Sequence, residues 1–139
     1  MKIVVEAFDS STAPQVARGA QITPEAKAEI AKAFGLLIPP TAEFLFYEHE
    51  AWLDQSFQIK LRMSQIEAES LLHHFPTKNA FWPSTNMMED DARFPEWTPS
   101  KARRFRALSI DNYSQGYLRV LVDYSDVNTA LVYVQWYTT

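Results

Sequence analysis

Three histidines and two groups of carboxylates are the side chains best suited to acid–base chemistry or metal binding. His49 lies between Glu48 and Glu50, a combination that would suit a hard or mixed metal ion. His73 and His74 are adjacent on an expected helix, so their side chains point about 100° apart and do not suit one ion. None of the established metal-binding spacings, such as His-x-x-x-His or an acidic calcium loop, is present. The sequence therefore predicts neither a metal site nor a cofactor.

The chain contains no cysteine and only three glycines. The lack of cysteine excludes disulfides, thiolate metal ligands, iron–sulfur clusters and cysteine nucleophiles. Three glycines are too few for a phosphate-binding glycine-rich loop, and the Gly-x-Ser-x-Gly motif of serine hydrolases is absent. Because no nucleophile motif is present, we predict no catalytic residue and expect a protein that is not an enzyme.

The segment 77–100 combines large apolar side chains, acidic side chains and prolines. Aromatic residues and methionine are enriched at the centres of protein–protein interfaces, and neighbouring carboxylates would select a basic partner. We therefore predict a partner-binding surface formed by Trp82, Met87, Met88, Glu89, Asp90, Asp91, Glu96 and Trp97. The alternative is that the apolar members cover an open face of the sheet and complete its core, since exposed patches this apolar are rare.

Four cations lie within six residues immediately after this segment: Lys101, Arg103, Arg104 and Arg106. Together with Phe105 they could contact phosphates and stack on a base, as in a nucleic-acid-binding strand. They would equally suit a solvated face or an intramolecular contact with the acidic segment. The net charge of −4 opposes binding to nucleic acid, so we expect no nucleic-acid partner and favour a solvated face.

The elements expected to position these groups alternate between strands and helices. Thr23-Pro24-Glu25 is a typical helix start and predicts a helix from Pro24 to Phe34. Ser64-Gln65-Ile66-Glu67 matches the capping box and predicts a second helix that ends at Phe75. The alternation from Phe57 to Met63 predicts a strand with Phe57, Ile59 and Leu61 on the core side. The expected strands are 2–8, 42–48, 57–63, 105–111, 117–124 and 130–137, and loops are expected at 9–20, 49–55 and 77–100.

This order, β-α-β-β-α-β-β-β, predicts an α+β fold with a mainly antiparallel sheet of about six strands and two helices on one face. The length of 139 residues fits a single domain spanning 1–139. No apolar run reaches the ~20 residues that span a bilayer. We also find no signal peptide, which predicts a cytoplasmic protein as the sequence is given, or a periplasmic one if an export signal has been removed. The oligomeric state stays open.

Several stretches from Gly35 onward follow a pattern of apolar spacing and turn residues. They are Gly35-Leu36-Leu37-Ile38-Pro39-Pro40-Thr41-Ala42, the strand from Phe57 to Met63 with Asp54 before it, the helix from Ser64 to Phe75, Trp97-Thr98-Pro99 and Val132-Tyr133-Val134. In this pattern the chain resembles small uncharacterised bacterial α+β proteins, many of them exported or lipoproteins. In size, charge and style it also resembles immunity proteins that neutralise bacterial toxins. These resemblances imply an α+β fold and no catalytic residues.

These observations lead to one expected function and two alternatives. We expect a non-enzymatic protein-binding module, an immunity-type protein that neutralises a basic toxin domain through its acidic, aromatic surface. One alternative is a small-ligand module in which 77–100 closes over a pocket lined by Tyr47, Trp52 and Trp136. A less favoured alternative is a nucleic-acid-binding protein that uses its arginines.

Overall fold

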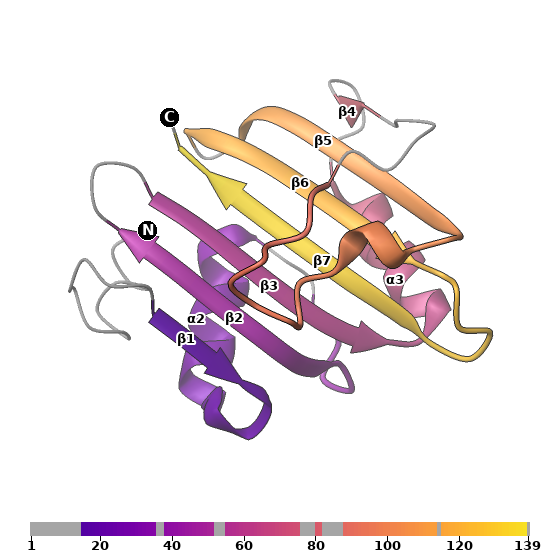
Figure 1. Cartoon of the computed structure of the whole chain (residues 1–139), viewed down its shortest axis with the longest axis horizontal. Coiled ribbons are helices and arrows are strands. Elements are labelled where there is room, and N and C mark those ends of the chain that lie inside the picture. The colour runs from indigo at the N-terminus through magenta and orange to yellow at the C-terminus, as the bar shows by residue number, and fades with distance from the viewer. Residues whose placement is uncertain are drawn as a thin grey trace.

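The computed structural model describes residues 15–35, 38–51, 55–75, 80–81, 88–113 and 115–138 (Figure 1). Its strands are β1 (Gln15–Arg18), β2 (Glu43–Ala51), β3 (Gln55–Met63), β4 (Ala80–Phe81), β5 (Phe105–Tyr113), β6 (Gly116–Asp123) and β7 (Ala130–Tyr137). Its helices are α2 (Pro24–Phe34) and α3 (Gln65–His74), with short 3-10 helices η1 (Gly19–Gln21) and η2 (Pro99–Lys101). The strands form one sheet in the order β1-β2-β3-β7-β6-β5-β4, and every neighbouring pair is antiparallel. This is the predicted α+β class.

Both helices begin at the residues that the sequence predicts. At α2 the Thr23 hydroxyl accepts a hydrogen bond from the Ala26 N–H at 3.1 Å, and Pro24 is the first helical residue. The helix ends at Gly35, whose φ of 62° is left-handed and suits glycine. At α3 the Ser64 hydroxyl accepts from the Glu67 N–H at 3.1 Å, while the Glu67 carboxylate accepts from the Ser64 N–H at 3.2 Å. The predicted capping box is confirmed.

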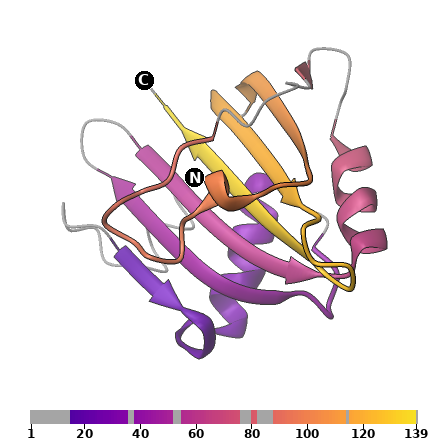
Figure 2. The same ribbon diagram turned by 45° about the vertical axis from the view of Figure 1, so that its right-hand side comes forward.

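The two helices cover the same face of the sheet, as predicted (Figure 2). Phe57, Ile59 and Leu61 of β3 point toward this side and are almost completely buried. They belong to one apolar cluster with residues of both helices, which include Ile30 of α2 and Leu71 and Leu72 of α3. The predicted register of β3 is confirmed.

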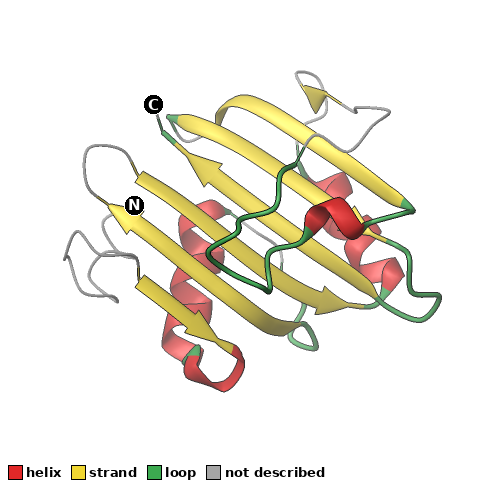
Figure 3. Cartoon of the chain, in the orientation of Figure 1, coloured by secondary structure: helices red, strands yellow, loops and turns green. Residues whose placement is uncertain are grey.

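The opposite face of the sheet carries a second apolar cluster beneath residues 88–102, which we call the covering segment. In Figures 1 and 3 this segment crosses in front of the central strands, on the side away from both helices. The cluster joins side chains of the covering segment to side chains of the sheet: Met88, Phe94, Trp97 and Ala102 with Phe46, Leu121 and Tyr133. The sheet is therefore packed on both faces.

The structure differs from the predicted strands in three places, and a further predicted strand falls on residues that are not described. The expected strand at 2–8 lies outside the described residues, whereas Gln15–Arg18 forms β1 within a stretch expected to be a loop. β4 likewise lies inside the expected loop 77–100. Finally, β2 continues through Ala51, where a turn was expected from residue 49. β1 and β4 depend on pairing with distant partners, such as Gln15 opposite His49, rather than on a local alternation of apolar and polar residues. The end of β2 instead pairs locally with the start of β3, with Ala51 opposite Gln55.

Candidate functional site

Two predicted interface anchors of the covering segment are core residues. Trp97 is 0% exposed and packs edge-on against Tyr133, with ring centroids 5.1 Å apart. Met88 is buried in the same cluster. A side chain that is buried in the unbound protein cannot be desolvated by a partner, so the prediction that Trp97 and Met88 anchor an interface is wrong. The other two predicted anchors, Trp82 and Met87, lie outside the described residues.

Of the four predicted acidic residues, Glu89 and Asp90 are exposed and Asp91 and Glu96 are part-buried. Three of the four have partners within the protein. Asp90 accepts hydrogen bonds from the backbone N–H and the hydroxyl of Ser100, at 2.9 and 2.6 Å. Both hydrogen bonds lower the pKa of Asp90, and the one from the hydroxyl has the larger effect. Glu96 forms an ion pair with Arg18. Glu89 is exposed, and within the described part of the chain its carboxylate has no partner.

Among the four predicted acidic residues, Asp91 is held by the most hydrogen bonds. Its two oxygens accept hydrogen bonds from Arg93, whose Nη2 lies 2.7 Å from Oδ2, and these bonds lower the pKa of Asp91. The same guanidinium pairs with Glu50 of β2. Backbone bonds from the Phe94 N–H to the Asp91 carbonyl, and from the Asp91 N–H to the Trp97 carbonyl, hold this turn together. The acidic run is thus held in place by the buried part of the covering segment.

A polar cleft of about 460 Å³ opens where the start of the covering segment meets the sheet. We call it the acidic cleft; its lining residues are Gln58, Glu89, Asp90, Asp91, Ala92, Arg119, Gln135 and Tyr137. The lining has three carboxylates against one guanidinium, so its net charge at neutral pH is about −2. Arg119 lies 5.5 Å from the centre of the Tyr137 ring, which stacks on Tyr117 and closes one wall. The sequence analysis missed the four sheet residues of this lining.

A buried carboxylate, Glu48, lies behind the acidic cleft. The Gln58 amide donates to Glu48 Oε2 at 3.3 Å and to Asp91 Oδ2 at 3.2 Å, and Gln135 donates to Gln58 Oε1 at 3.1 Å. Glu48 is 1% exposed, and its Oε1 has no partner among the described residues. Burial, followed by the charge of Glu50, raises the pKa of Glu48 to about 7. Its alternation with Phe46 on β2 could have placed Glu48 on this face, but the sequence does not show what covers that face.

His49 is buried on the other side of the sheet. Its ring stacks on Phe57, with centroids 4.2 Å apart and planes 5° apart, and burial lowers its pKa to about 4. Neighbouring residues of a strand point to opposite faces, so His49 does not join Glu48 in one site. Within the described ranges no group of three or more histidine, aspartate or glutamate side chains could hold a metal ion.

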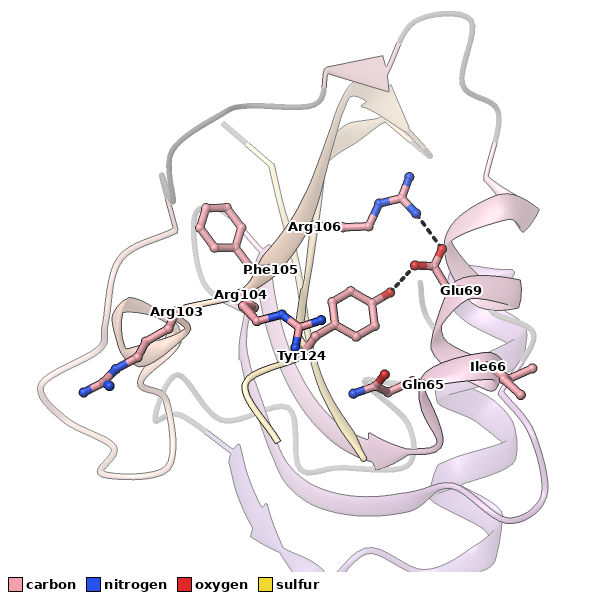
Figure 4. Close-up of a pocket in the computed structure, with 8 residues that line it drawn as sticks. All are labelled: Gln65, Ile66, Glu69, Arg103, Arg104, Phe105, Arg106 and Tyr124. Atoms are coloured by element: carbon pink, nitrogen blue, oxygen red, sulfur yellow. Dashed lines mark hydrogen bonds and ion pairs between the residues drawn. The ribbon is translucent and has the colours of Figure 1, made fainter. Parts of the chain in front are cut away.

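A second cleft, of about 810 Å³, lies between α3 and the start of β5 (Figure 4). We call it the arginine cleft; its lining residues are Gln65, Ile66, Glu69, Arg103, Arg104, Phe105, Arg106 and Tyr124. The three arginines point to different sides: Arg104 and Arg106 point toward α3, whereas Arg103 points away. Arg106 forms an ion pair with Glu69 at 2.7 Å. The three arginines therefore do not form the single basic surface that the nucleic-acid hypothesis requires.

The expectation that residues 77–100 close over a ligand pocket lined by Tyr47 and Trp136 is wrong. Tyr47 and Trp136 are buried in the cluster between the sheet and the helices. The covering segment packs on the opposite face, so it does not close over these two side chains. The third expected lining residue, Trp52, lies outside the described residues.

Comparison with protein-family models, with curated proteins and with solved structures gave no match to this chain. In the part of the chain that the structure describes, neither helix has the length and apolar character needed to cross a membrane. The function must therefore be argued from the two clefts themselves.

Proposed function

We propose that this protein is a non-enzymatic binding module whose acidic cleft receives a basic segment of a partner protein, and that its biological role is immunity to a bacterial toxin. The partner is a basic toxin domain, whose active surface would be blocked by the bound protein. The observation that carries the proposal is that Glu89, Asp90 and Asp91 all line one polar cleft.

The arrangement of these carboxylates suits the recognition of lysine or arginine. Hydrogen bonds hold Asp90 to Ser100 and Asp91 to Arg93 and Gln58, so their orientation is set before a partner arrives. A preorganised site loses less conformational entropy on binding than a flexible one. Glu89 is exposed beside them and remains available for an ion pair with the partner.

The charge of the whole molecule supports the same proposal. A net charge of −4 attracts a basic protein from a distance and accelerates its association. Such steering is typical of proteins that must capture a toxic partner quickly. Trp97 and Met88 are not part of this proposed interface, because their buried side chains stabilise the fold instead.

The proposal can be tested by affinity capture from the native host with three forms of the protein. They are the wild type, Glu89→Lys, and the control Asp111→Lys, which makes the same charge change at an exposed residue of β5. We expect a basic partner that the wild type and Asp111→Lys capture equally and that Glu89→Lys captures about tenfold less. The purified partner should be toxic, and one equivalent of the wild type should suppress its activity.

Two results would contradict the proposal. Equal capture by the wild type and Glu89→Lys would remove the acidic cleft from the interface. A captured partner whose activity is unchanged by an excess of the protein would exclude the immunity role.

A further inference from the structure

The arginine cleft lies at the other end of β6 from the acidic cleft. Its floor includes Tyr124, which directly follows β6, whereas the acidic cleft includes Arg119 near the start of that strand. The backbone on this side is held firmly: the Tyr124 N–H donates to the Arg104 carbonyl at 2.7 Å, and the Arg103 N–H donates to the Ser125 hydroxyl at 3.0 Å. Arg103 and Arg104, which precede β5, therefore project from a backbone that is hydrogen-bonded to the residues directly after β6, and Arg106 projects from β5 itself.

One half of the arginine cleft already binds a carboxylate from the protein itself. Glu69 of α3 accepts a hydrogen bond from the Tyr124 hydroxyl at 2.7 Å and forms its ion pair with Arg106 (Figure 4). A guanidinium and a phenol thus hold a carboxylate between the strand and the helix. Hydrogen bonds to an ionised carboxylate are stronger than those between neutral groups, and here one of the two donors is charged as well.

The other half of the arginine cleft contains a second arginine, Arg104, but no carboxylate opposite it in the part of the chain that is described. Arg104 lies two residues before Arg106 and points to the same side of the strand. Gln65 lies one helical turn before Glu69, so an acid at position 65 would stand opposite Arg104 as Glu69 stands opposite Arg106. Gln65 is neutral and instead donates from its amide to the Asp126 carbonyl at 2.7 Å. Within the described residues the Arg104 side chain has no hydrogen bond or ion pair.

Two large apolar side chains are exposed on the two segments that border the arginine cleft. Ile66 follows Gln65 in α3 and is 82% exposed, and Val127 follows Asp126 in the β6–β7 connection and is 77% exposed. The Gln65–Asp126 hydrogen bond brings these two segments together. Apolar side chains near an arginine can contact a protein segment but offer no interaction to a free anion.

We propose that the arginine cleft is a second binding site, in which Arg104 receives a glutamate or aspartate of a partner protein and Ile66 and Val127 contact its apolar neighbours. The protein's own Glu69 shows the geometry that the incoming carboxylate would repeat. A nucleic acid is a poorer fit, because the net charge is −4, Arg103 points away and Arg106 is already neutralised. This proposal does not depend on the function proposed for the acidic cleft.

The test uses the folded full chain and two matched tripeptides, N-acetyl-Leu-Glu-Leu-amide and N-acetyl-Leu-Gln-Leu-amide. Arginine Nε–H signals are followed by NMR during titration, and the Arg104 signal is assigned by its loss in Arg104→Gln. We expect a saturable shift of that signal with the glutamate peptide and none with the glutamine peptide. Gln65→Glu supplies an internal carboxylate and should reduce the affinity at least about fivefold, whereas Arg103→Gln should leave it within about twofold.

Fingerprint spectra of each variant show whether it is folded, and Gln65→Glu adds an acid at a surface position of the helix. Equal shifts with the two tripeptides, or no saturable shift with either, would overturn the proposal. Tighter binding of inorganic phosphate or of an oligothymidylate than of the glutamate peptide would also overturn it, in favour of a phosphate site. Unchanged affinity in Gln65→Glu would show that Arg104 is not the receiving group.

Discussion

Two adjacent residues of β2, Glu48 and His49, are buried on opposite faces of the sheet with opposite changes of pKa. Burial raises the pKa of Glu48 from 4.5 to about 7 and lowers that of His49 from 6.5 to about 4. The raised pKa of Glu48 makes its contribution to the free energy of unfolding largest below pH 4.5, and this contribution is lost as the pH rises through about 7. His49 contributes fully above pH 6.5, and its contribution is lost as the pH falls toward 4. Between pH 4.5 and 6.5 the two effects oppose each other.

Replacing Glu48 should therefore change how stability depends on pH. In Glu48→Gln the opposing effect of Glu48 is gone, so stability should rise more steeply from pH 4.5 to 6.5 than in the wild type. The free energy of unfolding of the variant relative to the wild type should increase by about 3 kcal/mol between pH 4.5 and 8. Urea denaturation at a series of pH values measures this, and a difference that stays constant with pH would contradict it.

Trp97 allows a second prediction at the scale of single residues. It fills the centre of the cluster beneath the covering segment, so Trp97→Ala should lower the free energy of unfolding by about 3–5 kcal/mol. Chemical denaturation measures this loss, and Val127→Ala, at an exposed site, provides a control with little expected effect. A loss below about 1 kcal/mol would mean that the covering segment does not depend on Trp97.

The elements that the sequence predicts best are those with local signals. The caps of α2 and α3 each depend on residues within one turn of the helix start, and the register of β3 depends on simple alternation. The strands that were missed, β1 and β4, depend on pairing with distant segments. Local patterns carry little information about such pairing.

The capping box gives a prediction at the scale of one element. Ser64→Ala removes the acceptor of the Glu67 N–H and should lower the free energy of unfolding by about 1 kcal/mol. Ser70→Ala, at an exposed interior position of the same helix, is the matched control and should leave stability unchanged or raise it slightly, because alanine has the higher helix propensity. Equal losses in the two variants, measured by thermal or urea denaturation, would show that the cap adds nothing to the stability of α3.

At the scale of the whole molecule, the covering segment decides which candidate site residues are available. The sequence identified its acids and its aromatic residues together but could not show that Trp97 points inward while Glu89 stays exposed. The burial of Glu48 was missed for the same reason, since the residues that cover it lie far along the chain. The acids of the predicted site were thus found from the sequence, but their division into partnered and available groups required the fold.

Whether an acidic residue has a partner within the protein also determines whether its replacement tests the interface alone. Asp91 holds Arg93 and Gln58, so replacing Asp91 would disturb the covering segment together with any interface. Glu89 has no such partner in the described part of the chain. Glu89→Lys should therefore leave the melting temperature within about 2 °C of the wild type, as most surface substitutions do.

The most direct test of the central claim is the salt dependence of association between this protein and the partner captured from its host. Association rate constants are measured between 50 and 300 mM NaCl for the wild type, Glu89→Lys and Asp111→Lys. If the acidic cleft receives a basic segment, the wild type and Asp111→Lys should both slow markedly with added salt. Glu89→Lys should associate about tenfold more slowly at low salt and depend less on salt. Identical rates and salt slopes for Glu89→Lys and the wild type would contradict the claim that the acidic cleft is the binding site.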